Sequence, residues 1–309
     1  LTKKFQDELP DCRLKDVLAM GQFFLQVGAV TPDLPYASIA DKDLFFTKQT
    51  HLADDFHYKK TNEIPLKVWP LLKDASLTDD ERYYAFSFFL GYCSHVVADS
   101  IVHPFVRDMV GNYQGNETEH RRLEMKMDVL FYNDYMGGIE LKYSDLHDEL
   151  KNIGDRKETK KIITILKDLI IEVYGKTFTV KKIMGWLGGL HLLFDIALNP
   201  HLRIFRHFDA FLYHNADDLL ADKEKTLLLT DAVGREKNFL NGKSVHFLKD
   251  CVPRYYKTFI PTANKAYEYV YNNGPEVTDK DLPATNLDTG RLLPDGDNLD
   301  LMPVYWEGC

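Results

Sequence analysis

Three residues spaced four apart carry side chains of the kinds that bind divalent metal ions. They are His95, Asp99 and His103, in the segment GYCSHVVADSIVHPF. Residues four apart lie on one face of an α-helix, about 6 Å from each other along its axis. His120 and Glu124 repeat this spacing further along the chain. Zinc in proteins takes imidazole and carboxylate ligands, often three or four to an ion, so these five residues are enough to start two zinc sites.

The helix that must position the first three residues has a strong start signal. Residues 76–81 read SLTDDE, which offers cap-type side chains followed by acids for the first turn. Apolar residues then keep helical spacing until Pro104, where a regular helix is expected to end. We therefore expect His103 in the last turn or just past it, and a further helix over residues 119–134. An unpaired Asp99 carboxylate would be costly inside so apolar a helix, which favours metal binding.

Apolar periodicity of 3.6 residues recurs along most of the chain and predicts an all-α fold. Loop character is expected for the segment 32–43, which contains two prolines, and residues 139–157 are expected to be irregular or a short helix. No strand alternation and no repeat of fixed period is found. The further helices are expected over residues 14–30, 50–58, 160–174, 182–198, 202–220, 235–251 and 255–271 (interrupted by Pro261). Residues 66–73 are a short apolar segment broken by Pro70.

Composition favours one domain with a tail. We predict a multi-helix domain over residues 1–271 and an extended tail over residues 272–309, where Pro, Asp, Asn and Gly become frequent. Leu301, Tyr305 and Trp306 are expected to lay this tail on the domain. The apolar run that begins at Ile183 is shorter than the roughly 20 residues that span a bilayer, so we interpret it as a buried helix.

Charge and cysteine content narrow the function classes. The net charge of -9 disfavours a stable nucleic-acid partner, which would require a basic face. The four cysteines are far apart and form no CxxC pair, so there is no zinc-ribbon or thioredoxin-type signal. The first residues, LTKKFQDELPDC, are polar and do not resemble a secretory signal. The compartment stays open between cytoplasmic and secreted.

Taken together, these motifs resemble the bacterial zinc-dependent phospholipase C family, which is structurally similar to the fungal single-strand nucleases. The resemblance rests on GY-x-SH-xxx-D-xxx-HP, followed by H-xxx-E on the next helix. Upstream, GAVTPDLPY and HLADDFHY resemble the family's G-x-x-x-P-D and histidine segments. The motif match covers about residues 14–135. It implies an all-α fold of the zinc-dependent phospholipase C type.

The resemblance also implies a first zinc ion. His95 and Asp99 correspond to the family's H-xxx-D pair on that ion. Asp33 corresponds to a further ligand or to the general base, so it is both a metal-ligand and a catalytic candidate. An upstream histidine completes the set; His51 is the first choice and His57 the second.

A second zinc ion is implied by His103, His120 and Glu124, which match the ligands of the family's other site. Family members often add a third ion, held partly by the amino terminus and an early histidine and bridged by the residue that corresponds to Asp99. No histidine precedes His51 in this chain. We therefore expect two Zn²⁺ ions and leave the third open.

The expected activity is hydrolysis of a phosphoric ester, most like that of a phospholipase C. A phospholipid or another phosphate ester is the expected substrate, with transient contact at a membrane surface. Two alternatives stay open: a non-catalytic helical protein stabilised by metal, and a phosphodiesterase of the single-strand-nuclease type. The first is motivated by the incomplete set of amino-terminal ligands, and the second is disfavoured by the net charge of -9.

Two histidine motifs outside this set have simpler interpretations. His191 and Asp195 are spaced four apart on an apolar helix, and with no further ligand nearby we expect a buried hydrogen-bonded pair. The dipeptide His147-Asp148 lies in the polar run YSDLHDELKN, where a surface turn is expected.

Overall fold

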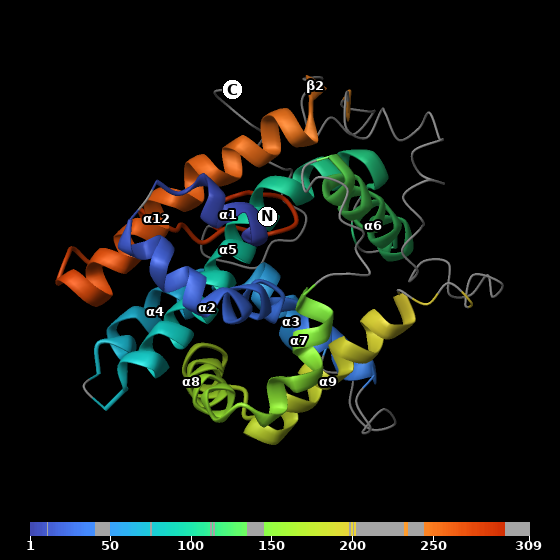
Figure 1. The fold of residues 1–309 in the computed structure, drawn as a ribbon. Helices are drawn as coiled ribbons and strands as arrows, with labels where there is room; N and C mark the ends of the chain where they lie inside the picture. Colours follow the sequence, from blue (N-terminus) through green and yellow to red (C-terminus); the bar gives the residue numbers. More distant parts are fainter. Residues whose placement is uncertain are drawn as a thin grey trace.

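The structure, a computed structural model, describes all residues except 11, 41–49, 75, 112, 114, 135–144, 198, 200, 202–231, 234–243 and 294–309. It confirms the all-α fold (Figure 1). The one sheet among the described residues is a pair of two-residue antiparallel strands. The elements are α1 (Thr2–Glu8), α2 (Arg13–Ala29), η1 (Thr31–Ala40), α3 (Thr50–Tyr58), α4 (Glu63–Leu72), α5 (Asp79–Val110), α6 (Glu117–Asp134), α7 (Asp145–Asn152), η3 (Ile153–Asp155), α8 (Lys157–Tyr174), α9 (Val180–Ala197), β1 (Ala232–Val233), β2 (Ser244–Val245), η6 (Phe247–Cys251) and α12 (Val252–Asn272).

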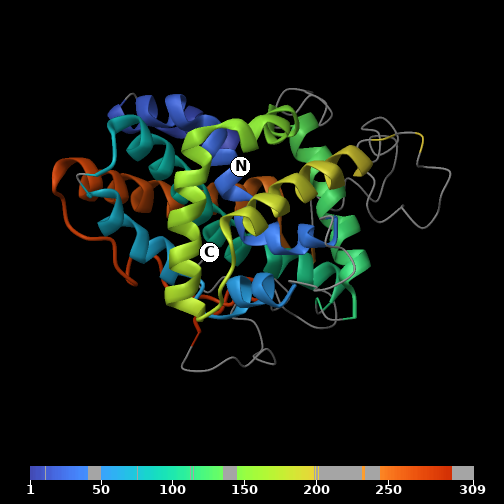
Figure 2. The ribbon, with the colours of Figure 1, turned by 90° about the horizontal axis from the view of Figure 1, so that it is seen from below.

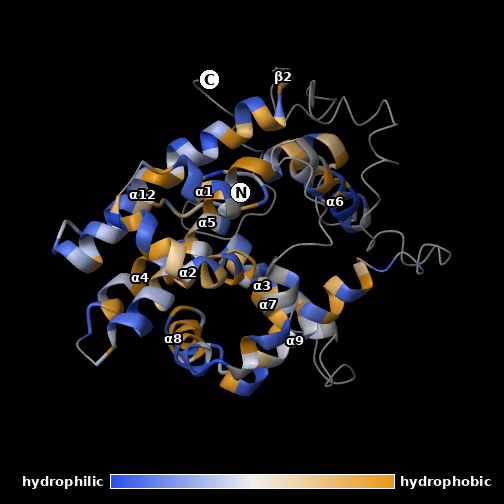
Figure 3. Ribbon diagram, in the orientation of Figure 1, coloured by the Kyte–Doolittle hydropathy of each residue, from blue (hydrophilic) through white to orange (hydrophobic). Residues whose placement is uncertain are grey.

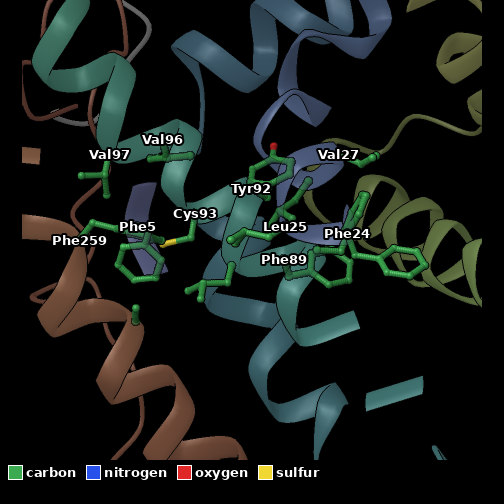
Figure 4. Packing of buried hydrophobic residues seen from close by; sticks show 14 of the residues in the cluster. Phe5, Phe24, Leu25, Val27, Phe89, Tyr92, Cys93, Val96, Val97 and Phe259 are labelled. Atoms are coloured by element: carbon green, nitrogen blue, oxygen red, sulfur yellow. The ribbon is translucent and has the colours of Figure 1, made fainter. Parts of the chain in front are cut away.

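Helix α5 is the centre of the fold, and α2 packs along it. Leu25 of α2 and Phe89 of α5 lie together in the core, with Phe5 and Phe259 packed nearby (Figure 4). Helices α8 and α9 lie in front of this core when it is seen from below (Figure 2). Hydrophobic and hydrophilic residues lie on different sides of α8 (Figure 3), and the hydrophobic side is buried. Such one-sided helices bury their apolar face against a core.

Helix α5 begins where the sequence predicts. Thr78 Oγ1 accepts a hydrogen bond from the Glu81 backbone N–H at 3.2 Å, and Glu81 Oε2 accepts one from the Thr78 backbone N–H at 2.9 Å. This reciprocal pair is a capping box, and it satisfies two of the backbone donors that a helix start leaves open. By length and composition α5 could cross a membrane, but 78% of its apolar window is buried inside the protein, as in the core helix of a globular domain.

The predicted end of this helix at Pro104 is wrong, because α5 continues to Val110. Proline lacks an N–H and leaves the carbonyl four residues earlier, that of Ser100, without its helical partner. Gly290 lies against this carbonyl: a Cβ at position 290 would be 2.5 Å from the Ser100 oxygen, and its φ is +68°. A glycine is therefore needed there for both reasons. His103 consequently lies inside the helix rather than at its end.

Three other segments also differ from prediction around prolines. Residues Thr31–Ala40 form the 3₁₀ helix η1 rather than a loop, with Pro35 inside it. Pro70 does not break α4, which ends two residues later, and Pro261 does not interrupt α12. The carbonyl that Pro261 leaves without a partner belongs to Lys257, which is exposed, so water can bind it.

Several predictions fall on residues that the structure does not describe. These are the helix over 202–220, which includes His207 and His214, most of the helix over 235–251, and the tail anchors Leu301, Tyr305 and Trp306.

Two glycines allow α2 and α5 to approach each other backbone to backbone. A Cβ at Gly91 would lie 2.1 Å from the Leu25 carbonyl oxygen, and one at Gly28 would lie 1.8 Å from the Phe88 carbonyl oxygen. Contacts this short are not possible, so any larger residue must push the helices apart.

We expect Gly91→Ala to lower the free energy of unfolding by about 2–3 kcal/mol, because the added methyl group overpacks a backbone contact. The control is Gly188→Ala on α9, where a Cβ would meet no atom within 4 Å. That variant should gain up to about 1 kcal/mol from helix propensity. Denaturant unfolding measures both, and equal stability of the two variants would contradict the close approach.

The described part of the predicted tail, residues 272–293, packs against the helical domain. Thr61 Oγ1 donates to the Thr285 carbonyl at 2.8 Å, and the Leu287 backbone N–H donates to the His57 carbonyl at 2.9 Å. Asp288 forms a buried ion pair with Arg107 of α5. The domain boundary at residue 272 stays a prediction.

We expect Asp288→Ala to lower the free energy of unfolding by about 3–5 kcal/mol, because it leaves the buried Arg107 guanidinium without its carboxylate. The matched control is Glu172→Ala. It breaks the exposed pair with Lys67, 2.8 Å apart, and should cost less than about 1 kcal/mol. Thermal unfolding compares the two, and a loss at Asp288 as small as that of the control would show that the pair does not hold the tail.

Candidate metal centre

Three elements bring Asp33, His57 and His95 together. They come from η1, α3 and α5, and one potential ligand atom from each lies within 4.8 Å of the others. His57 Nε2 is 3.2 Å from Asp33 Oδ1 and 3.2 Å from His95 Nε2. Both histidines are buried. Segments that are distant in sequence thus converge on one point beside α5.

A second group forms where α5 meets α6. His103 Nε2 is 3.1 Å from Glu124 Oε1, and His120 Nε2 is 3.3 Å from the same oxygen. The two imidazole rings meet edge to face, with centroids 5.0 Å apart. The spacing of four on α6 therefore places His120 and Glu124 against His103, as the helical pattern predicts.

Asp99 joins the two groups. Its Oδ2 lies 3.0 Å from His95 Nε2, 3.4 Å from His57 Nε2 and 3.7 Å from His103 Nε2. Asp99 stands one helical turn from His95 on one side and from His103 on the other, so a single carboxylate faces both. The arrangement is one continuous centre rather than two separate sites.

The histidines of the first group are oriented by backbone carbonyls. His57 Nδ1 lies 2.7 Å from the Ala53 carbonyl oxygen, and His95 Nδ1 lies 2.9 Å from the Ala29 carbonyl oxygen. A carbonyl only accepts, so each Nδ1 carries a proton and each ring directs its Nε2 inward.

This orientation tests whether the residues fit a metal ion. Two Nε2 atoms face each other at 3.2 Å beside the carboxylates of Asp33 and Asp99. Lone pairs and carboxylate oxygens repel at such a distance unless a proton or a metal cation lies among them. Histidines held through the other ring nitrogen are typical of zinc ligands. The residues of this group therefore fit zinc.

The pKa values of the first group reflect the same charges. Burial would lower the pKa of His57, but hydrogen bonds and charge from Asp33 and Asp99 outweigh burial and raise it well above its ordinary value. The pKa of His95 is raised in the same way, mainly by Asp99 against the effect of burial. Burial would raise the pKa of Asp99, yet the charges of its histidine neighbours hold it well below its usual range. The carboxylate therefore stays ionised and attracts a cation.

The pKa values of His103 and Glu124 in the second group are shifted for the same reasons. Burial opposes the charged form of His103, but the carboxylates of Asp99 and Glu124 raise its pKa to about 9. Burial would raise the pKa of Glu124, but hydrogen bonds from His103 and His120 hold it well below its usual range. A metal ion that binds His103 must replace the proton that these carboxylates hold on its imidazole.

Two carboxylates open the centre to solvent. The side chains of Asp33 and Glu124 are 49% and 41% exposed, whereas that of Asp99 is 15% exposed. Asp33 and Glu124 are therefore the ligand candidates that solvent reaches, and Asp99 is largely covered.

The first-choice ligand His51 does not reach the centre. Its side chain is 86% exposed, and its nearest carboxylate is that of Asp54 on the same helix, 3.9 Å away. His57, the second choice, is the residue of α3 that contacts Asp33, Asp99 and His95. The preference for His51 is thus corrected, because the buried face of α3 carries His57.

Two tyrosines beside the centre are not part of the predicted site. Tyr113 meets the His120 ring edge to face, with centroids 5.0 Å apart. Tyr36 lies 6.1 Å from the His57 ring and donates a hydrogen bond to Asp54 Oδ1 at 2.9 Å. The position of Tyr36 three residues after Asp33 is the sequence signal that could have found it. Tyr113 lies in the loop between the two ligand-bearing helices.

Comparison with known proteins supports the resemblance seen in the motifs. The family model described as zinc-dependent phospholipase C matches residues 3–179, which is more than half of the chain and includes every residue of the centre. Among curated proteins and among solved structures, nothing matches. On the strength of that family match, the chain belongs to the zinc-dependent phospholipase C family.

Proposed function

We propose that the protein is a zinc-dependent phosphodiesterase of the phospholipase C type, and that the centre around Asp99 is its active site. The observation that carries the proposal is the position of Asp99 Oδ2, which lies within 3.7 Å of three histidine nitrogens. A carboxylate shared between two groups of ligands is suited to holding two ions close together. Such a pair would suit a phosphate ester, because it would supply stabilisation for charge that develops on the ester oxygens.

The ligands divide into two sets around Asp99. Each set contains two imidazoles and at least one carboxylate, which is a typical zinc environment. The first set is Asp33, His57, His95 and Asp99, and the second is His103, His120 and Glu124.

The charge of the loaded centre suits a phosphodiester. Asp33, Asp99 and Glu124 contribute three negative charges, and two divalent ions contribute four positive charges, so the sum is one positive charge. A diester phosphate carries one negative charge. The loaded centre would therefore be positive and attract the phosphate, although the net charge of the whole chain is -9.

When bound, zinc supplies Lewis acidity that activates water near neutral pH and neutralises charge on the phosphate. Around it, His57 and His95 keep their protons on Nδ1, where the backbone carbonyls hold them, so both rings stay fixed as ligands. Asp33 is half exposed, and its carboxylate would serve as a ligand of the ion or take the proton of the attacking water.

Tyr113, which lies against the His120 ring, would add a contact to the substrate. Burial and the charges of Glu124 and Asp33 raise the pKa of Tyr113 to about 12. It therefore remains a phenol at neutral pH and can donate a hydrogen bond to a phosphate oxygen. The substrate class we propose is a phospholipid, in keeping with the family, and the acidic chain disfavours a polynucleotide.

We expect metal removal to lower kcat/KM for the chromogenic diester bis-p-nitrophenyl phosphate by at least about 10³-fold, because several kcal/mol of transition-state stabilisation is lost. Addition of zinc should restore the rate, and a chelator already saturated with zinc should leave it unchanged. Zinc content is measured on the same samples. A protein that binds zinc and loses thermal stability on chelation, but never hydrolyses a diester, would instead be the non-catalytic metal-stabilised protein.

A further inference from the structure

A third group of potential ligands shares no residue with the centre and lies where α7 meets α9 (Figure 1). His147, expected at a surface turn, is in α7, and His191 and Asp195 are one turn apart in α9. His147 Nε2 is 2.7 Å from Asp195 Oδ1, and His191 Nδ1 is 3.4 Å from Asp195 Oδ2. The expected pair of His191 and Asp195 thus gains a third member from another helix.

The two imidazoles are stacked rather than spread apart. Their centroids are 4.9 Å apart and their planes differ by 13°. Each ring presents a nitrogen to a different oxygen of the same carboxylate. One potential ligand atom of each of the three residues lies within 4.8 Å of the others. This is a small set of two nitrogens and one oxygen gathered around one point.

A hydrogen-bond network alone does not satisfy this group. His191 Nδ1 faces Asp195, and its other nitrogen, Nε2, is buried without a hydrogen-bond partner among the described residues. A buried polar atom of this kind destabilises the fold. The nitrogen of His191 that faces Asp195 is Nδ1, so the gathering of the three ligand atoms, rather than Nε2, is the observation that bears on a cation.

We propose that His147, His191 and Asp195 form a separate site for one divalent transition-metal ion of the zinc class. Two imidazoles and one carboxylate are ligands that zinc accepts, whereas calcium and magnesium prefer oxygen alone. One carboxylate leaves a divalent ion with one net positive charge. The histidine side chains are 21% exposed and Asp195 is 48% exposed, so the ion exchanges with solvent and a water can complete its coordination.

The site would couple two parts of the fold. An ion held by His147 and Asp195 would link α7 to α9, which are separated in the sequence by η3 and α8. Helix α9 in turn packs along η1, the element that carries Asp33. The ion would therefore stabilise the packing of α9 on η1, the helix that carries Asp33, without touching the substrate.

The test counts zinc ions on the full-length protein. Metal-free wild-type protein and the His191→Ala variant are dialysed against the same buffered zinc solution, and bound zinc is measured by elemental analysis. The variant should hold one ion fewer per chain, and zinc should raise its melting temperature less than that of the wild type. His201→Ala, which removes an exposed histidine outside the group, should match the wild type.

This difference of one ion does not depend on the proposed active site, because His191→Ala leaves that centre intact. If the centre bound no zinc at all, the wild type would still hold one ion and the variant none. Asp195→Asn, which keeps the side-chain shape, gives a second reading and should also lose one ion. Equal zinc content in the wild type and both variants overturns the proposal.

Discussion

Asp99→Asn is expected to lower kcat/KM for a phosphodiester by at least about 10³-fold. The substitution keeps the size of the side chain but removes the charge that three histidine nitrogens share within 3.7 Å. In the proposed centre, the first ion would lose a charged ligand, and the link to the second group would be broken. Zinc content should fall along with activity.

The control for this prediction is Asp80→Asn on the same helix. Asp80 is exposed in the first turn of α5, away from the centre. The activity of the Asp80→Asn protein should therefore stay within about twofold of the wild type. A small loss of stability is expected there, since a negative charge at a helix start is worth about 0.3–1 kcal/mol. Full activity in the Asp99→Asn protein would show that the shared carboxylate is not part of the reaction.

His57→Ala should abolish activity as strongly as chelation does, by about 10³-fold or more, because it removes a ligand from the first ion. His51→Ala should change kcat/KM by less than about twofold. Both residues are in α3, but their side chains are 7% and 86% exposed. Steady-state kinetics and zinc content measured side by side give the comparison.

The pair also decides between the two ligands that the sequence leaves open. A larger loss for His51→Ala than for His57→Ala would mean that α3 presents a different face in the working enzyme. Folding of the His57→Ala protein is checked by circular dichroism, because removal of a buried ring leaves a cavity.

Much of the centre could be predicted because helical spacing is a local property. His95, Asp99 and His103 share a face as soon as residues 79–110 become helical, and the same holds for His120 and Glu124. The capping signal at Thr78 likewise depends on nearby residues only.

The choice between His51 and His57 required more than spacing. Helix α3 has the predicted bounds, so the error concerns only its rotation. Leu52, Ala53 and Phe56 are buried, and His57 stands four residues after Ala53 on that same face. A comparison of the apolar face with each histidine would have favoured His57.

The errors at prolines have a different cause. Pro104 lies within α5, and Gly290, far along the chain, packs against the carbonyl that loses its helical partner there. A local rule cannot include a residue that only the fold brings near. The contact of Asp288 with Arg107 is out of reach for the same reason.

The acceptor that orients His95 has a genetic consequence. It is the main-chain carbonyl oxygen of Ala29, and every amino acid at position 29 has this oxygen. Drift at that position therefore leaves the ligand's proton where it is. Inherited changes at Gly28 or Gly91, which are not ligands themselves, would move the oxygen instead, and harmful alleles of this protein should be sought at the helix crossing as well as among the ligands.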